Sequence, residues 1–358
     1  MEITFSYLQL LQFSKDIFSK IGCNQQDADT AAHALLSADL RGIDSHGVAR
    51  LCGYVRLWEV NRMNACGVPK IIHETPSTAV VDGDGGLGLV VAPFAMKLAI
   101  EKAKNVGTGW VSVQNSNHFG IAGYHAMMAL EYDMIGIAMT NASPLVAPTF
   151  STERLLGTNP IAVAVPAGSE PSFVADFATT TASNGKLEIL QRKNEAAPEG
   201  WVQTKNGEPC TDASILKNGG AMLPLGGDKE HGSHKGYMLG SIVDIFSGVL
   251  SGGNYGPWVP PFPAYIPMPE GMPGKGIGHF FGAMRVDAFR PAADFKTNMD
   301  KWIQRFRAAK TVEGFESVVI PGEPEAAMEK KRLLNGIPVV QSVVGELKEL
   351  AEKFSLAL

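Results

Sequence analysis

A histidine and an arginine in the run Arg41-Gly-Ile-Asp-Ser-His-Gly-Val-Ala-Arg50 are the residues in this chain best spaced to do chemistry together. His46 and Arg50 stand four residues apart, directly after an Asp-Ser pair. If Asp44 or Ser45 caps a helix that begins there, the imidazole and the guanidinium project from one helix face. An arginine that grips a carboxylate in two bonds, beside a histidine that gives or takes a proton, suits reduction of a 2-oxo acid. The alternative is a capped helix with a surface arginine and an incidental histidine.

Other polar residues follow predicted strands or open predicted helices. His118 ends a β-rich run and could be a base, a ligand to substrate or a satisfied core residue. Asp176 ends another run and could orient a histidine, accept from a ribose hydroxyl or cap the next element. Asn159 lies in the turn Gly157-Thr-Asn-Pro160, which exposes backbone N–H groups. Lys235 opens an apolar helix and could bind an anion such as pyrophosphate, although a solvated lysine is commoner.

The segment Gly83-Asp-Gly-Gly-Leu-Gly88 matches the G-x-G-x-x-G dinucleotide fingerprint between a predicted strand and a predicted helix. The fingerprint also needs an acidic residue at the end of the second strand to hold the ribose. That strand, residues 110–117, ends in amides and a hydroxyl. We therefore predict a tight glycine turn here and not a Rossmann cofactor site.

Composition and charge narrow the class of protein. The chain has 358 residues, 45% hydrophobic and 19% charged, with a net charge of −5. No basic run favours nucleic-acid binding, and no apolar stretch is long enough to span a membrane. The first residues lack the pattern of a signal peptide. No metal-ligand spacing occurs, so no metal is expected. The cysteines have no paired spacing and are expected to be reduced thiols in a cytoplasmic protein. They are Cys23, Cys52, Cys66 and Cys210.

The periodicity of apolar residues changes along the chain. Helical spacing dominates the first sixty residues, with Asn24 as a cap for the second helix. Short β-rich runs alternate with helices beyond residue 77. They are 78–82, 109–113, 135–139, 161–165, 173–176 and 278–284. An apolar helix is predicted over 236–250, an irregular Pro- and Gly-rich loop over 252–275, and amphipathic helices near the C-terminal end.

These patterns predict an α/β protein in which helices from both chain ends pack together around a central α/β part. We expect residues 1–76 to form the first part of a helical domain. Residues 77–254 would form the central α/β cofactor-binding domain, and residues 255–358 would return to the helical domain.

The motifs taken together resemble the malate/L-lactate dehydrogenase family that does not use a Rossmann fold. The resemblance extends over nearly the whole chain, in the same order as in the family. It is carried by Arg41-Gly-Ile-Asp-Ser-His-Gly, Ser116-Asn-His-Phe-Gly, Leu156-Gly-Thr-Asn-Pro-Ile-Ala, Asp176-Phe-Ala-Thr-Thr, Pro198-Glu-Gly-Trp, Gly232-Ser-His-Lys-Gly-Tyr, Gly278-His-Phe-Phe, Ile320-Pro-Gly-Glu-Pro-Glu and Gly336-Ile-Pro.

The resemblance implies a non-Rossmann α/β fold with a mixed sheet and a homodimer. It also implies interconversion of a 2-hydroxy acid and a 2-oxo acid, malate or L-lactate, with NAD or NADP. His46 would move the proton with support from Ser45, and Arg50 would bind the substrate carboxylate. His118 lines the same pocket and is the base in some relatives, Asn159 is a further substrate contact, and Asp176 joins the catalytic set. The cofactor would be held by Asn141, Ser143, Pro144, Asp176, Phe177, Ala178, Thr179, Thr180, His234, Lys235, Gly322, Glu323 and Pro324.

A few positions depart from the family pattern. Relatives often have Ser or Thr at the position of Ala142, Met238 replaces a common Gly, and the loop over 252–275 is unusually rich in Pro. Two alternatives therefore stay open. One is a cyclic imino acid or sugar-acid reductase on the same scaffold, and the other is a catalytically silent metabolite-binding protein. Five intact chemical groups count against the silent protein. They are His46, Arg50, His118, Asp176 and Lys235.

Overall fold

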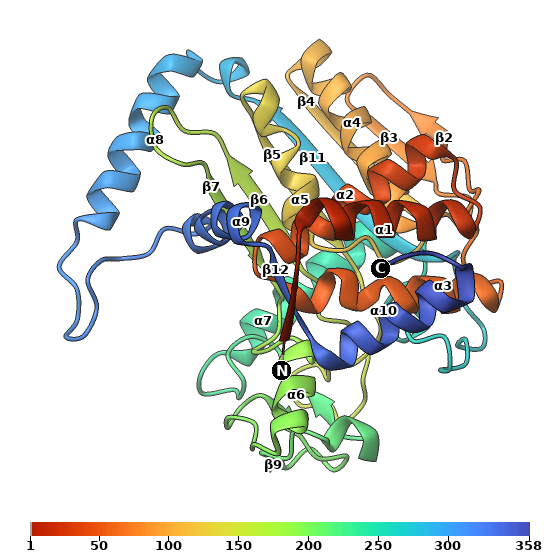
Figure 1. The fold of residues 1–358 in the computed structure, drawn as a ribbon. Coiled ribbons are helices and arrows are strands. Elements are labelled where there is room, and N and C mark those ends of the chain that lie inside the picture. Colours follow the sequence, from red (N-terminus) through yellow and green to blue (C-terminus); the bar gives the residue numbers. More distant parts are fainter. Residues whose placement is uncertain (1) are drawn as a thin grey trace.

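The computed structural model describes residues 2–358, which form a mixed sheet, a helical unit beside it and a small lobe (Figure 1). The helices are α1 (Tyr7–Lys20), α2 (Gln25–Leu40), α3 (Leu51–Glu59), α4 (Gly88–Val106), α5 (Ala122–Met127), α6 (Asn184–Lys193), α7 (Ser233–Asp244), α8 (Ala292–Arg307), α9 (Glu323–Asn335) and α10 (Gln341–Phe354). The strands are β1 (Glu2–Phe5), β2 (Lys70–Glu74), β3 (Thr78–Asp82), β4 (Thr108–Ser116), β5 (Met134–Thr140), β6 (Ile161–Val165), β7 (Phe173–Phe177), β8 (Val202–Gln203), β9 (Pro209–Cys210), β10 (Ala221–Met222), β11 (Ile277–Arg285) and β12 (Ile337–Val340).

The central sheet has seven strands in the order β2-β3-β4-β11-β5-β6-β7. Strands β3 and β4 are parallel and every other neighbouring pair is antiparallel, so the predicted mixed sheet is confirmed. Helix α4 packs so closely on β4 that a Cβ on Gly109 would lie 1.9 Å from the Ala99 carbonyl oxygen. Small side chains at this face therefore set the distance between helix and sheet.

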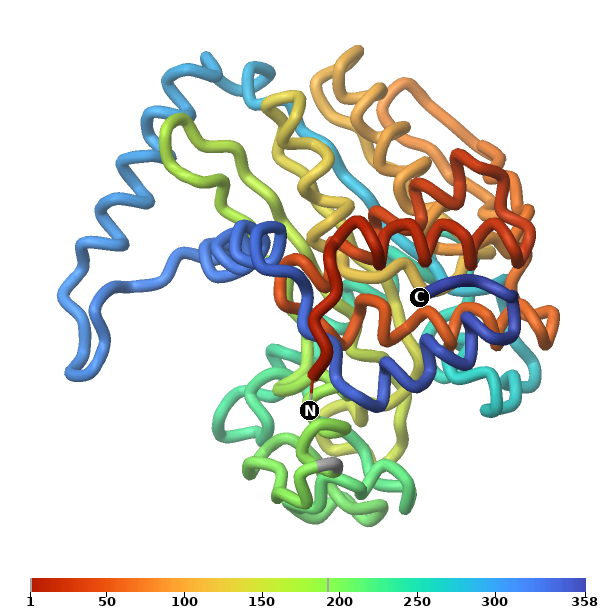
Figure 2. The backbone as a smooth tube through the Cα atoms, viewed as in Figure 1, coloured from red at the N-terminus to blue at the C-terminus, as the bar shows by residue number. Residues whose placement is uncertain are grey.

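The two ends of the chain build one helical unit, as predicted. Strand β1 pairs antiparallel with β12, and the same core includes buried residues from α1, α2, α3 and α10 (Figure 2). The helix starts follow their caps. Ser6 accepts from the Gln9 N–H at the start of α1, and Asn24 accepts from the Asp27 N–H at the start of α2.

A small lobe built from residues between β7 and α7 was not expected from the sequence. It holds α6 and the three-stranded sheet β10-β8-β9, and it has its own apolar core. In Figure 2 this green segment lies apart from the main sheet, at the bottom of the view. Its strands have two residues each, too short to show a clear alternation of apolar and polar side chains.

The predicted helix start at His46 is wrong. Residues Asp44–His46 and Val48–Arg50 form two 3₁₀ turns, and α3 begins only at Leu51. The Ser45 hydroxyl bonds the His46 ring instead of capping a helix, and the Asp44 carboxylate pairs with Arg332. Both predicted caps are therefore engaged elsewhere.

The C-terminal part that returns to the helical unit is shorter than the predicted 255–358. Strand β11 comes from that segment but lies in the middle of the central sheet, paired with β4 and β5. Its residues are almost all buried, as expected for a strand covered on both faces. The predicted apolar helix over 236–250 is present as α7, which begins at Ser233 and continues into a π-helical stretch, Ile245–Val249.

The glycine turn at residues 83–88 is packed against the end of β4. The N–H groups of Gly83 and Gly85 donate to the carbonyls of Gln114 and Asn115, and the Asn117 side chain bonds the carbonyls of Gly85 and Gly86. These N–H groups are therefore engaged within the protein, in keeping with the predicted tight turn. Within residues 2–358, no helix combines the length and the apolar character needed to cross a membrane.

Candidate active site

Two histidines from distant parts of the chain lie face to face at the junction of the helical unit and the sheet. The His46 and His118 rings stack with their centroids 5.7 Å apart and their planes 26° from parallel. His46 ends the first 3₁₀ turn after α2, and His118 lies two residues after β4. The tertiary structure therefore brings both predicted proton-transfer residues into one place.

Tyr54 sets the orientation of His118. Its hydroxyl lies 2.7 Å from His118 Nδ1, and the Gly120 N–H donates to the same nitrogen at 3.3 Å. Because a nitrogen that accepts a backbone N–H carries no proton itself, Tyr54 donates to Nδ1 and the neutral ring holds its proton on Nε2. Tyr54 is completely buried in α3.

Ser45 and Arg50 border the site on the other side of His46. The Ser45 hydroxyl lies 2.8 Å from His46 Nδ1, and Arg50 Nε donates to the Ser45 carbonyl at 2.6 Å. Both residues line a cavity of about 620 Å³. The Arg50 side chain is 24% exposed, and one of its terminal nitrogens lies 4.0 Å from the Glu188 carboxylate. The guanidinium is thus available to an anion in the cavity.

The turn that carries His46 is hydrogen-bonded to a buried acidic residue. Asp39, in the last turn of α2, accepts from the Val48 N–H at 2.8 Å. A Cβ on Gly47 would lie 2.1 Å from the Asp39 carboxylate atoms, so only glycine fits. Arg332 from α9 bonds both the Asp39 carbonyl and the Asp44 carboxylate. Burial raises the pKa of Asp39 to about 8, against the effect of the Val48 hydrogen bond.

The electrostatics of the site favour uncharged imidazoles. Burial, followed by the nearby Arg50 charge, lowers the pKa of His46 to about 4. Burial also lowers the pKa of His118 well below its ordinary value, with smaller contributions from His46, Arg50 and His279. At neutral pH both rings are therefore neutral, and His46 can accept a proton. An anion bound at Arg50 would offset one cause of these shifts and raise both pKa values.

Asp176 lines a different cavity from the one that His118 lines, and its catalytic role stays a prediction. Its carboxylate accepts from the Gly123 N–H at 2.7 Å and faces a separate cavity of about 320 Å³. Phe177, Gly322 and Pro324 line the same cavity, so four of the predicted cofactor residues lie together there.

Asn159 is fully buried and its side chain is engaged within the protein. It accepts from the Ala142 N–H and donates to the Gly240 carbonyl, so each polar atom of its side chain already has a partner within the protein. Asn141 is similarly engaged, since its side chain bonds Asp244, Asn254 and Gly278. These amides fix the backbone of the turns that carry them.

The remaining residues predicted to bind the cofactor lie in α7 or around it. Thr179 donates to the carbonyls of Thr158 and Asn159, and a Cβ on Gly240 of α7 would lie 3.1 Å from its hydroxyl. His234 is half-buried and Lys235 is exposed in the first turn of α7. The side chains of Ser143 and Thr180 are engaged by the Phe262 N–H and the Ala182 carbonyl. The exposed Lys235 is thus the side chain of this group best placed to meet an anion. Pro144 and Ala178 are partly exposed beside Ser143 and Thr179 and bring no polar side chain.

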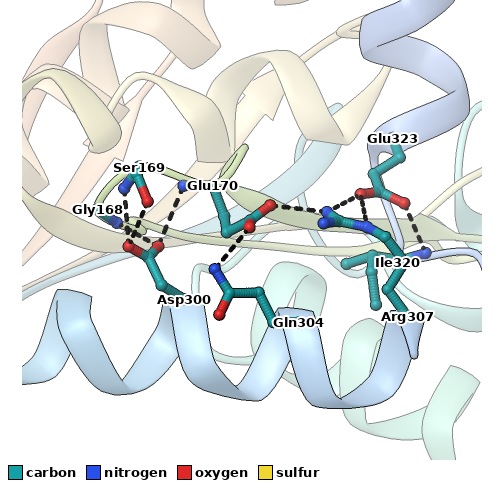
Figure 3. A network of polar contacts seen from close by, with 8 residues as sticks. All are labelled: Gly168, Ser169, Glu170, Asp300, Gln304, Arg307, Ile320 and Glu323. Atoms are coloured by element: carbon teal, nitrogen blue, oxygen red, sulfur yellow. Dashed lines mark hydrogen bonds and ion pairs between the residues drawn. The ribbon is translucent and has the colours of Figure 1, made fainter. Parts of the chain in front are cut away.

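Glu323 is committed to an ion network at the edge of the sheet (Figure 3). One of its carboxylate oxygens accepts from Arg307, and the other accepts from the Ile320 N–H at 3.1 Å. Arg307 also pairs with Glu170 at 2.8 Å. In the same network Asp300 of α8 accepts from backbone N–H groups over residues 168–170. Glu323 therefore ties α9 to α8, and its side chain is not free for a cofactor.

Three residues near the histidines were missed by the sequence analysis. Tyr54 stands four residues after Arg50, a spacing that could have placed it on the same face. Asp39 and Phe262 carry no local signal, because their contacts are with residues distant along the chain or across a turn. Among the described residues, no cluster of three or more His, Cys, Asp or Glu side chains is arranged to hold a metal.

We predict that Gly47→Ala destabilises the protein and reduces turnover. The new methyl group would meet the Asp39 carboxylate, and overpacking of this kind typically costs about 1–3 kcal/mol. Gly345→Ala is the matched control, because nothing lies within 4 Å of a Cβ at that position in α10. Thermal unfolding of both variants measures the difference. Equal melting temperatures for Gly47→Ala and the parent would contradict the packing of this turn.

Comparison with known proteins identifies the family to which the chain belongs. A family model described as malate/L-lactate dehydrogenase matches residues 5–348. The malate dehydrogenase of Pyrococcus abyssi is 45% identical over 346 residues, covering 96% of this chain and 93% of that protein. The L-sulfolactate dehydrogenase of Methanocaldococcus jannaschii is 38% identical over 342 residues, covering 95% and 94%. The solved structure of malate dehydrogenase from Pyrococcus horikoshii OT3 has a TM-score of 0.90 and 40% identity, covering 99% of this chain and 97% of that one. The chain therefore belongs to the malate/L-lactate dehydrogenase family, oxidoreductases that act on a CH–OH donor.

Proposed function

We propose that this protein interconverts a 2-hydroxy acid and a 2-oxo acid, with malate or L-lactate as the hydroxy acid, and uses NAD or NADP. The observation that carries the proposal is the stacked His46–His118 pair beside the partly exposed Arg50 side chain. A proton acceptor and a carboxylate clamp within one site are what a 2-hydroxy acid requires. Relatives named malate dehydrogenase support the choice of malate.

Arg50 binds the substrate carboxylate in this proposal, and its charge-assisted bonds orient the adjacent hydroxyl carbon. His46 takes the hydroxyl proton during oxidation and returns it during reduction. Ser45 holds the His46 ring through Nδ1, which leaves Nε2 to face the substrate. His118, with its proton on Nε2, donates a hydrogen bond to the substrate oxygen.

Family membership implies a nicotinamide cofactor, which when bound supplies or accepts the hydride at the substrate carbon. The cavity beside Asp176 fits a polar, partly aromatic ligand. It presents an exposed carboxylate, the exposed Phe177 ring and the turn at Gly322. Asp176 would accept from a ribose hydroxyl there, and Lys235 would meet phosphate oxygens. We infer that the segments around α7 and the Gly322 turn together hold the cofactor.

We also propose a homodimer, as the family resemblance implies. The last turns of α7 and the π-helical stretch after it leave several large apolar side chains exposed, which is the surface character of an interface. They are Met238, Ile242, Ile245, Phe246, Val249 and Leu250. Analytical ultracentrifugation measures the assembly directly, and a monomer at micromolar concentration would contradict it.

The direct test is His46→Ala assayed with NADH or NADPH and oxaloacetate or pyruvate. Removing a general acid–base group typically lowers the rate about 10²- to 10⁴-fold, while cofactor binding should stay nearly unchanged. His33→Ala is the control, since that ring contacts Tyr7 far from the site. A turnover within about threefold of the parent would move the proton-transfer role to His118.

Arg50→Lys should raise the KM for the oxo acid much more than it weakens cofactor binding. Lysine keeps the charge but loses the planar pair of donors. Loss of one charge-assisted bond of about 1.5–3 kcal/mol corresponds to roughly tenfold to hundredfold in KM. The methyl ester of the substrate provides a second check. An ester that reacts as well as the acid would rule out a carboxylate clamp.

The pH dependence of hydroxy acid oxidation should follow the lowered histidine pKa values. The base must be neutral, and the pKa of His46 is about 4. The value of kcat/KM should therefore stay level as pH falls to about 5 and decline once the imidazole takes up a proton, at about pH 4 and below. Initial rates after brief exposure to each pH measure this. A midpoint near the ordinary histidine value would contradict the described environment.

A further inference from the structure

Phe262, from the Pro-rich loop over 252–275, stands between two cavities of the site. It lines the 620 Å³ cavity that contains Ser45 and Arg50, and it also lines a second cavity of about 250 Å³ that contains His118. Its ring centroid lies 4.8 Å from that of His118 and meets the Tyr54 ring edge-on at 5.3 Å. The ring is therefore part of the wall between the larger cavity, which holds Arg50, and the smaller one, which His118 lines.

A glycine in α3, Gly53, leaves space for the Phe262 ring. A Cβ on Gly53 would lie 2.6 Å from two atoms of the Phe262 ring. A glycine inside a helix is unfavourable by roughly 0.5–1 kcal/mol relative to alanine. The helix therefore carries an unfavourable residue at the one point where the ring approaches its backbone.

Arg62, just beyond the end of α3, anchors the loop that carries Phe262. One terminal nitrogen donates to the carbonyls of Pro263, Ala264 and Ile266, and the other donates to the Pro261 carbonyl. A chain this rich in proline has few N–H donors of its own for those carbonyls, and the guanidinium supplies them. From the opposite side, the Ser143 hydroxyl accepts from the Phe262 N–H at 2.9 Å. The backbone around Phe262 is thus held on both sides.

We propose that Arg62 is a positioning residue that holds Phe262 against His118, and that the ring keeps water from this histidine and limits the size of the substrate. The inference extends the proposed function, because it assigns the Pro-rich loop a role at the same histidine pair. Arg62 lines the smaller cavity together with Phe262 and His118, and in this proposal it acts by holding Phe262 in place.

Removing the Phe262 ring is expected to raise the pKa of His118. The charged or titratable groups near His118 are His46, Arg50, Tyr54 and His279, and Arg62 lines the same cavity. All five are unchanged in Phe262→Ala. Burial is the largest cause of the lowered His118 pKa. Without the ring, water from the larger cavity could reach His118 and would therefore raise that pKa toward the ordinary histidine value of about 6.5.

The test compares Phe262→Ala, Arg62→Ala, Arg62→Lys and Gly53→Ala with the parent. The control is Arg154→Ala, which removes another arginine that anchors a loop through carbonyls, those of Leu216 and Gly220. Three measurements are made on the full chain. Hydrogen–deuterium exchange reports the 255–271 loop, NMR follows the His118 titration, and kcat/KM is compared for phenylpyruvate and pyruvate.

We expect Arg62→Ala to speed exchange in the loop, and both Arg62→Ala and Phe262→Ala to raise the His118 pKa. Both should also raise the phenylpyruvate-to-pyruvate ratio roughly tenfold or more. Arg62→Lys should lie between parent and Arg62→Ala, since an ammonium cannot reach all four carbonyls. Gly53→Ala should shift the His118 pKa without loss of helix stability. Arg154→Ala should change neither the His118 pKa nor the phenylpyruvate-to-pyruvate ratio.

A loop that stays protected in Arg62→Ala would overturn the anchoring role. A loop that loosens while the His118 pKa stays unchanged would overturn the role of Phe262. Exchange and NMR need no turnover, so they decide the inference even if the parent reduces no 2-oxo acid, a result that would refute only the proposed function.

Discussion

The position of His46 depends on one buried acceptor, the Asp39 carboxylate in the last turn of α2. This group accepts a hydrogen bond from the Val48 N–H, and its atoms leave no space for a side chain at Gly47. Arg332, almost three hundred residues later in the chain, bonds the Asp39 carbonyl and holds the turn from the other side. Because the turn is fixed by these long-range contacts, His46 keeps one orientation without a helix around it.

The site exists only where two separately packed parts of the chain meet. The helical unit, closed by the β1–β12 pair, carries His46 and Arg50, whereas β4 of the central sheet delivers His118. The Tyr54 hydroxyl bonds His118 across this junction at 2.7 Å. A shift between helical unit and sheet would therefore separate the rings, and the tight packing of both cores protects the alignment.

The same junction sets the charge state of the site. Two half-buried imidazoles next to a guanidinium resist protonation, so the pocket combines two neutral imidazoles with one fixed positive charge. A substrate carboxylate at Arg50 would reduce that positive potential and raise the proton affinity of His46. Substrate binding and proton transfer are thus coupled through Coulomb attraction over a few ångströms.

The sequence by itself determined the elements and the family. Caps such as Asn24 and the alternating run at residues 161–165 predict their helix and strand, because neighbouring residues control those choices. The tertiary structure alone decided that the turn at His46 is not a helix and that Phe262 reaches His118. It also decided that β11 joins the central sheet. These outcomes depend on contacts between residues far apart in the chain. Local propensity and residue spacing carry no information about such contacts.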